Sequence, residues 1–152
     1  MRLLQGWLIC SLAIALPCFG CSSKSDGRPE RVPVTGSITF NEKPLQNAAI
    51  AFVPVGSSGS PATGATDSDG SYELMTFETA DGAIPGSYNV SIVATGEDPN
   101  RNPDGSQKYS EEDPRWTQPK STIPEHYNDP IKSKLNATVS VDGENEHNFD
   151  LK

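Results

Sequence analysis

The feature that most constrains the fold is a two-residue alternation of apolar and polar side chains, repeated in short runs that turns interrupt. In the run 32–40, valine, isoleucine and phenylalanine share one parity, while threonine and serine occupy the other. This period is typical of a β-strand with one buried face. No stretch shows a convincing helical period, so the sequence predicts an all-β fold. The other predicted strands are 50–53, 62–66, 72–74, 88–94, 135–141 and 149–151.

Turn-forming residues separate these runs and set the expected architecture. The run 50–53 is apolar on both faces, which indicates a central strand. About seven strands joined by short turns are typical of a β-sandwich. The predicted turns are 41–44, 67–70, 81–86 and 142–143, and the predicted core is Phe40, Phe52, Leu74, Val90, Ile92, Leu135, Val139 and Phe149.

One long segment, 96–122 (the insertion), breaks this rhythm. It contains ten charged residues and four prolines. Loops of this length in compact domains are either functional or disordered, so the insertion is either a solvated, mobile segment or a contact loop that uses Trp116. Just beyond it, Ile123 and Tyr127 are four residues apart, so a single helical turn seats both on the sandwich. Trp116 and Tyr127 are therefore the candidate contact residues.

The N-terminal residues differ from the rest of the chain. Arg2 is the only charged residue among the first twenty, and an almost wholly apolar run follows it and stops at Pro17. A charged start before a short apolar run indicates a secretory signal. A membrane-spanning helix is the alternative, but it needs about 20 apolar residues. We expect residues 1–20 to be a signal peptide.

The positions of the cysteines sharpen this expectation. Cys10, Cys18 and Cys21 are the three cysteines of the chain, so the predicted sandwich contains none. The segment 16–21 resembles the lipobox of bacterial lipoproteins, although Cys18 and Phe19 depart from the usual aliphatic and small residues. Cleavage after Gly20 leaves Cys21 as the thiol that carries the lipid. We expect Cys21 to be lipidated, with 21–31 as a flexible tether; the alternative is an ordinary signal in which Cys21 has no role.

The charge of the chain restricts its partners. The formal net charge is −8 at pH 7. Such a surface repels nucleic acid and anionic lipid headgroups. We therefore expect no nucleic-acid partner, and a membrane attachment that comes from the lipid on Cys21 rather than from a basic patch.

Residues suited to metal binding or catalysis are few. Asp67 and Asp69 begin a fragment of a calcium loop, and Glu78 occupies its twelfth position. A predicted strand fills the interval, so an Asx turn is the favoured interpretation. His126 and His147 are too few for a zinc site, which needs three or four ligands. No serine or cysteine lies in a nucleophile elbow. We expect no catalytic residue, metal or cofactor.

Several short motifs, in their order along the chain, resemble those of carboxypeptidase regulatory-like domains. The resemblance implies a seven-stranded transthyretin-like (prealbumin-like) sandwich over 32–152, interrupted by the insertion. It implies a mostly non-catalytic accessory, adhesive or structural module, of the kind that some small bacterial lipoproteins carry. Glu42 stands where the family usually has glycine. The motifs are 34–38, 43–45, 50–54, 66–72 and 84–90, followed by Ile123-Pro124 with Tyr127, 133–135 and 149–151.

Together these features predict a non-catalytic lipoprotein of the cell envelope, anchored in a membrane with its domain outside the cytoplasm. The sandwich has a structural or protein-interaction role, and its partner is an envelope protein or a polysaccharide. The alternative is a carbohydrate- or calcium-binding module. An enzyme is the third class, because a sandwich can bring together residues that are distant in sequence.

Overall fold

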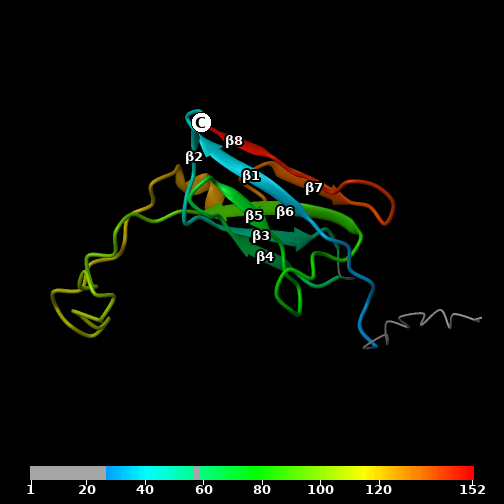
Figure 1. Cartoon of the computed structure of the whole chain (residues 1–152). Helices are drawn as coiled ribbons and strands as arrows, with labels where there is room; N and C mark the ends of the chain where they lie inside the picture. The colour runs from blue at the N-terminus through cyan, green and yellow to red at the C-terminus, as the bar shows by residue number, and fades with distance from the viewer. Residues whose placement is uncertain (1–26, 57–58) are drawn as a thin grey trace, which may run out of the picture.

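The computed structural model describes residues 27–56 and 59–152, which form two β-sheets packed face to face (Figure 1). The all-β prediction is confirmed: the described residues contain eight strands and a single 3₁₀ turn. The predicted signal peptide and Cys21 lie outside the described residues. The elements are β1 (Thr35–Phe40), β2 (Lys43–Pro44), β3 (Ala49–Pro54), β4 (Ala62–Ala65), β5 (Ser71–Glu73), β6 (Gly86–Val93), η1 (Glu125–Asn128), β7 (Leu135–Val139) and β8 (Phe149–Leu151).

One sheet has the order β4-β3-β6-β7, with all neighbours antiparallel. β3 lies inside this sheet, as its apolar residues on both faces predicted. Ile50 pairs with Ile92 and Phe52 with Val90, so large apolar side chains face the core from adjacent strands. This direct cross-strand pairing fixes the register, because a shift of one residue would turn every apolar side chain towards solvent.

The other sheet is built around β1, which pairs with β2 and β5 in antiparallel fashion and with β8 in parallel. β2 is the strand that the sequence did not predict, since 41–44 was interpreted as a turn. The turn consists only of Asn41 and Glu42, with φ angles of 51° and 64°. Two residues with positive φ make a tight hairpin. Lys43 and Pro44 therefore return beside Phe40 and Thr39.

The core lies between the two sheets and is centred on Phe52. Its ring centroid lies 5.7 Å from that of Tyr88 and 6.3 Å from that of Phe149, which joins the two sheets through aromatic contacts. Six of the eight predicted core residues are buried, while Phe40 and Leu135 are partly buried against them. Val141 is exposed, because β7 ends at Val139.

Candidate functional site

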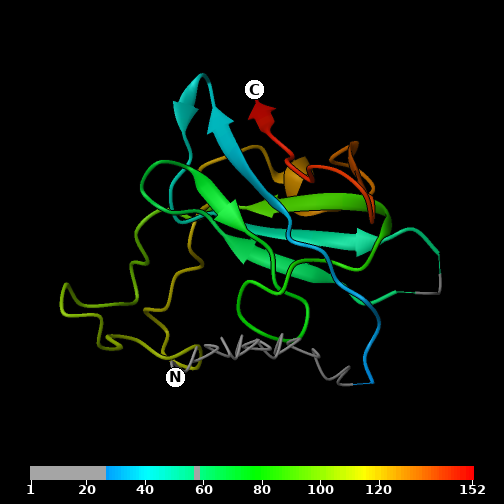
Figure 2. The ribbon, with the colours of Figure 1, turned by 45° about the vertical axis from the view of Figure 1, so that its right-hand side comes forward.

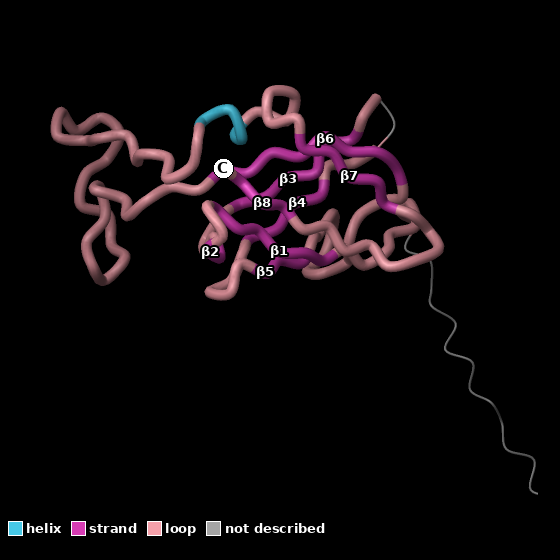
Figure 3. Tube along the Cα trace, turned by 90° about the horizontal axis from the view of Figure 1, so that it is seen from above, coloured by secondary structure: helices cyan, strands magenta, loops and turns pink. Residues whose placement is uncertain are grey.

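The insertion projects from one end of the sandwich and is the most prominent departure from it (Figures 2 and 3). Its two ends meet in a short antiparallel ladder beyond β6. The Gly96 N–H donates to the Lys120 carbonyl at 3.1 Å, and the Thr122 N–H donates to the Ala94 carbonyl at 2.9 Å. Ala94 is buried, so the ladder is fixed to the core at its base. The segment between its ends extends away from both sheets.

Asn100 organises the interior of the insertion. It is only 3% exposed, although the segment around it is largely polar. Its side-chain Nδ2 donates to the Thr117 carbonyl and to Asp98 Oδ1, and its Oδ1 accepts from the Thr117 N–H. Its backbone carbonyl accepts from the Lys108 and Tyr109 N–H groups. Asn100 thus joins three passes of the chain, one through its side-chain amide and one through its backbone carbonyl, in addition to its own.

The outer part of the insertion carries a cluster of cationic and aromatic groups. The Arg115 guanidinium lies 4.5 Å from the centroid of the Tyr109 ring, and Lys108 Nζ lies 5.1 Å from it. Arg115 also forms two hydrogen bonds to the Asp113 carboxylate, at 2.8 and 3.0 Å. These bonds, with one from the Arg115 backbone N–H, lower the pKa of Asp113 to about 2. Trp116 follows in the chain and is partly exposed.

Tyr127, the second predicted contact residue, is a core residue. The predicted helical turn is present as η1, and it seats Ile123 and Tyr127 on the sandwich at 4% and 9% exposure. The Tyr127 hydroxyl accepts a hydrogen bond from the Lys152 N–H at 3.2 Å, which ties the turn to the C-terminal residue. Its ring is therefore not available as an exposed anchor, and Trp116 alone retains the predicted contact role.

At the opposite end from the insertion, residues 27–33 (the strap, blue) lead into the sandwich (Figure 2). Val32 exchanges two backbone hydrogen bonds with Ala83, at 2.9 and 3.0 Å. Gly82 lies directly beneath, with a φ of 82°, and a Cβ atom there would lie 1.8 Å from the Val32 carbonyl oxygen. Glycine is thus required for the close approach. The predicted tether, 21–31, extends into this docked strap.

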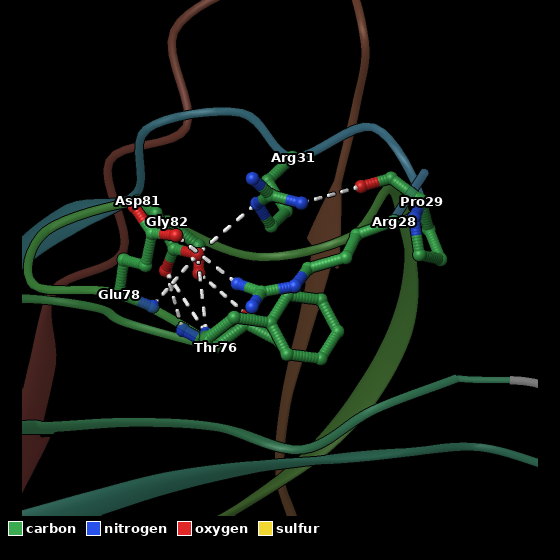
Figure 4. Close-up of polar contacts among 8 residues, drawn as sticks. Arg28, Pro29, Arg31, Thr76, Glu78, Asp81 and Gly82 are labelled. Carbon is green, nitrogen blue, oxygen red and sulfur yellow. Dashed lines mark hydrogen bonds and ion pairs between the residues drawn. The ribbon is translucent and has the colours of Figure 1, made fainter. Parts of the chain in front are cut away.

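Asp81 holds the strap and the loop 76–82 together (Figure 4). Its carboxylate accepts hydrogen bonds from the backbone N–H groups of Thr76, Phe77 and Glu78, and it pairs with Arg31 Nε at 3.0 Å. The two paired side chains are 17% and 12% exposed. Burial raises the pKa of Asp81, but the three backbone hydrogen bonds and Arg31 outweigh it and lower the pKa overall.

Phe77 completes this cluster. The Arg28 and Arg31 guanidinium carbons lie 5.2 and 5.3 Å from its ring centroid. Arg28 also pairs with Glu78 at 3.1 Å. Sequence reasoning did not identify Asp81 or Asn100, because both resemble ordinary turn residues. The role of each becomes apparent only in the folded chain, where residues distant in sequence lie beside it.

The candidate cation residues form a turn. Asp67 Oδ1 accepts hydrogen bonds from the Asp69 and Ser71 N–H groups, both at 2.9 Å, so the Asx-turn interpretation is confirmed. Glu78, the candidate twelfth ligand, pairs with Arg28 instead. Within 27–56 and 59–152, no three histidine, cysteine, aspartate or glutamate side chains are grouped closely enough to hold a metal ion.

A shallow groove of about 630 Å³ lies over β1 and β5, beside the loop 75–80. Its lining is rich in hydroxyl and carboxylate groups, and its one aromatic side chain, Tyr72, is buried at 3% exposure. Tyr72 donates its hydroxyl hydrogen to the His147 carbonyl. The polar lining residues include Thr35, Ser37, Ser71, Glu73, Glu146 and Asn148.

None of the helical segments in the described part of the chain has the length and apolar character needed to cross a membrane.

Comparison with known proteins identifies no family for the chain. No family model matches the chain, and no curated protein matches it. One solved structure, a 9R-lipoxygenase from Cyanothece PCC8801, aligns with 87% of this chain at 14% sequence identity and a TM-score of 0.37. The chain spans 18% of that protein's length, and a likeness at this level supports no inference about activity.

Proposed function

We propose that the protein is a non-catalytic lipoprotein of the bacterial cell envelope, anchored through Cys21, whose sandwich presents the insertion to another envelope component. The lipobox-like segment 16–21 supports the anchor. The order of motifs that resemble carboxypeptidase regulatory-like domains supports a transthyretin-like accessory module. The anchor favours a domain outside the cytoplasm, where we propose that the partner is an envelope protein or a polysaccharide.

The observation that carries the contact role is the internal order of the insertion. A solvated loop without a role needs no buried polar centre. The side-chain amide of the buried Asn100 bonds to Asp98 and Thr117, and its backbone carbonyl accepts hydrogen bonds from the N–H groups of Lys108 and Tyr109 in the next pass of the loop. Holding a surface segment in one conformation lowers the entropy lost on binding. Trp116, partly exposed on this framework, is the residue type that most often anchors a protein contact.

Removal of the insertion tests this role. A chain that lacks residues 100–120 should keep its fold and its membrane attachment. The deletion removes the Gly96–Lys120 hydrogen bond of the ladder but keeps the bond from the Thr122 N–H to the buried Ala94, which fixes the ladder to the core. Cross-linking in intact cells followed by mass spectrometry should then show the loss of partners that the full chain captures. Trp116→Ala should weaken the same cross-links. If every partner persists in both variants, the contact role is wrong.

The anchor is tested separately. The Cys21→Ala variant should accumulate unprocessed or appear in the soluble fraction, since no other thiol lies beyond the predicted cleavage position. Cys10→Ala is the matched control, because Cys10 lies within the predicted signal peptide and should not affect attachment. A Cys21→Ala protein that is cleaved and membrane-bound like the wild type would exclude the lipoprotein assignment.

The polar groove over β1 and β5 favours a second candidate, carbohydrate binding. Hydroxyl, carboxylate and amide side chains there, such as Ser71, Glu73 and Asn148, are suited to hydrogen bonding with sugar hydroxyl groups. The groove lacks an exposed aromatic ring on which a sugar could stack, so we rank this function second. Calorimetry with envelope polysaccharides tests it: binding that Glu73→Gln abolishes would support this alternative.

A further inference from the structure

The described residues expose large apolar side chains at both ends of the sandwich. Val55, Phe77 and Val141 are 59%, 40% and 56% exposed and lie at the end from which the strap leaves. Val93 and Ile131 lie towards the insertion end. In Figure 1, β3 and β7 both run towards this end, and Val55 and Val141 follow them. The insertion projects from the other end.

Contacts within the structure confirm that these residues share one end. The Val55 N–H donates to the Ser87 carbonyl near the start of β6, and Ser87 pairs with Thr138 near the end of β7. Val141 lines a shallow depression together with Val32 and Pro33 of the strap. Phe77 lies against Arg28 and Arg31 of the strap. Phe77 and Val141 thus lie beside the strap, and Val55 lies at the same end through its bond to β6.

The length of chain between the predicted anchor and the strap limits how far this end can lie from a membrane. Arg28 is held to the domain through Glu78 and the Phe77 ring. Cys21 precedes it by seven residues, which span at most about 25 Å when fully extended. A lipid on Cys21 therefore keeps this end near the bilayer surface, at a high effective concentration.

We infer that Val55, Phe77 and Val141 form a membrane-contact face that rests on the lipid surface holding the anchor, with the insertion directed away from it. The inference rests on the proposed lipid anchor. The occupant is a zwitterionic lipid surface, because acidic residues such as Glu30 and Glu144 accompany the strap arginines and give no basic patch. The contact depends on apolar burial, which adds to an attachment that the lipid already provides.

Site-specific fluorescence in the lipidated full-length protein tests the orientation. Val55→Cys and Val141→Cys each introduce one thiol, since the predicted lipid occupies Cys21 and the other cysteines lie in the predicted signal. The labelled proteins are reconstituted into phosphatidylcholine vesicles that contain a nitroxide-labelled phosphatidylcholine. Labels at 55 and 141 should be quenched severalfold more strongly than labels at two matched apolar positions, Val93 and Ile131. These controls are also exposed but lie towards the insertion end.

A charge variant shows whether the apolar residues hold the orientation. Val55→Glu should reduce the quenching of a label at position 141, whereas Ile131→Glu should leave it unchanged. Equal quenching at all four labelled positions, in protein that floats with the vesicles, would overturn the membrane-contact face and leave the anchor intact. Protein that carries no lipid by mass and does not float would show instead that the proposed anchor is wrong, and the inference would fail with it.

Discussion

The strap and the insertion are both polar segments at opposite ends of one sandwich, and each depends on one side chain with many partners. Asp81 is charged and joins the strap to the loop 76–82. Val32 of the strap also exchanges two backbone hydrogen bonds with Ala83, the residue that follows this loop. Asn100 is neutral and joins only residues of the insertion. We therefore expect Asp81 to stabilise the strap as part of the domain's cooperative structure. Asn100 stabilises an insertion that we expect to open on its own.

The loss of stability caused by a core substitution is the reference for substitutions in the strap and the insertion. Phe52→Ala should lower the free energy of unfolding by about 3–5 kcal/mol, because the truncated ring leaves a cavity among Tyr88, His147 and Phe149. Chemical denaturation measures the change. Thr138→Ala, on the exposed face of β7, is the control and should have little effect. Equal effects of the two substitutions would contradict the register.

Loss of the Asp81 carboxylate should be the largest effect outside the core. Asp81→Ala leaves three backbone N–H groups without their acceptor and Arg31 without its partner, so we expect a loss of about 1–3 kcal/mol in global stability. Glu78→Ala removes the same charge from an exposed pair and should cost less than about 1 kcal/mol. Similar thermal midpoints for the two variants would show that the strap is not part of the cooperative unit.

Asn100→Ala should have a local effect. The Thr117 N–H and carbonyl lose their partners, which costs about 1–3 kcal/mol within the insertion. Hydrogen exchange should accelerate across residues 97–120, while exchange in β3 and β6 and the thermal midpoint stay unchanged. Asn102→Ala is the matched control, since the Asn102 side chain bonds only to Ser106 near the tip. A lower thermal midpoint for Asn100→Ala would mean that the insertion unfolds together with the sandwich.

Acidification should change the stability contribution of Asp81 but not that of Asn100, and this change should be the smallest of the expected effects. The folded-state pKa of Asp81 lies below its unfolded value of about 3.9, so its contribution is complete above that pH and is lost as the pH falls through the folded pKa. The stability difference between wild type and Asp81→Asn should therefore shrink below about pH 4. The difference between wild type and Asn100→Ala should not follow this curve. Denaturant midpoints measured from pH 6 to pH 2.5 provide the comparison.

The sequence predicts most of the sandwich because a half-buried strand imposes its period on neighbouring residues. β3, β6 and β8 lie within or around their predicted runs for this reason. β2 was missed because a strand of two residues has no measurable period. Val141 continues the alternation of β7 into solvent, so alternation alone does not reveal where a strand ends.

The roles of Asp81 and Asn100 could not be predicted from the sequence, for a different reason. Asp81 acts through Arg31 and Asn100 through Thr117, so the role of each depends on residues that only the folded chain brings near. Tyr127 illustrates the opposite error. Its spacing from Ile123 correctly predicted a turn that seats both on the sandwich, yet the same burial removes Tyr127 from the surface on which a partner could bind.

The parallel pairing of β1 with β8 has a consequence for the order of events during folding. Ile38 lies beside Phe149 and Phe40 beside Leu151, so the first long strand pairs with a strand that follows all the others in the chain. Closing a loop of this length is slow, because its entropic cost precedes the contacts that repay it. A chain that emerges from a ribosome or a translocation channel N-terminus first cannot complete its core until β8 is free to pair. We therefore expect deletion of residues 149–152, which removes β8, to arrest folding at a state with exposed core side chains, rather than merely to lower stability.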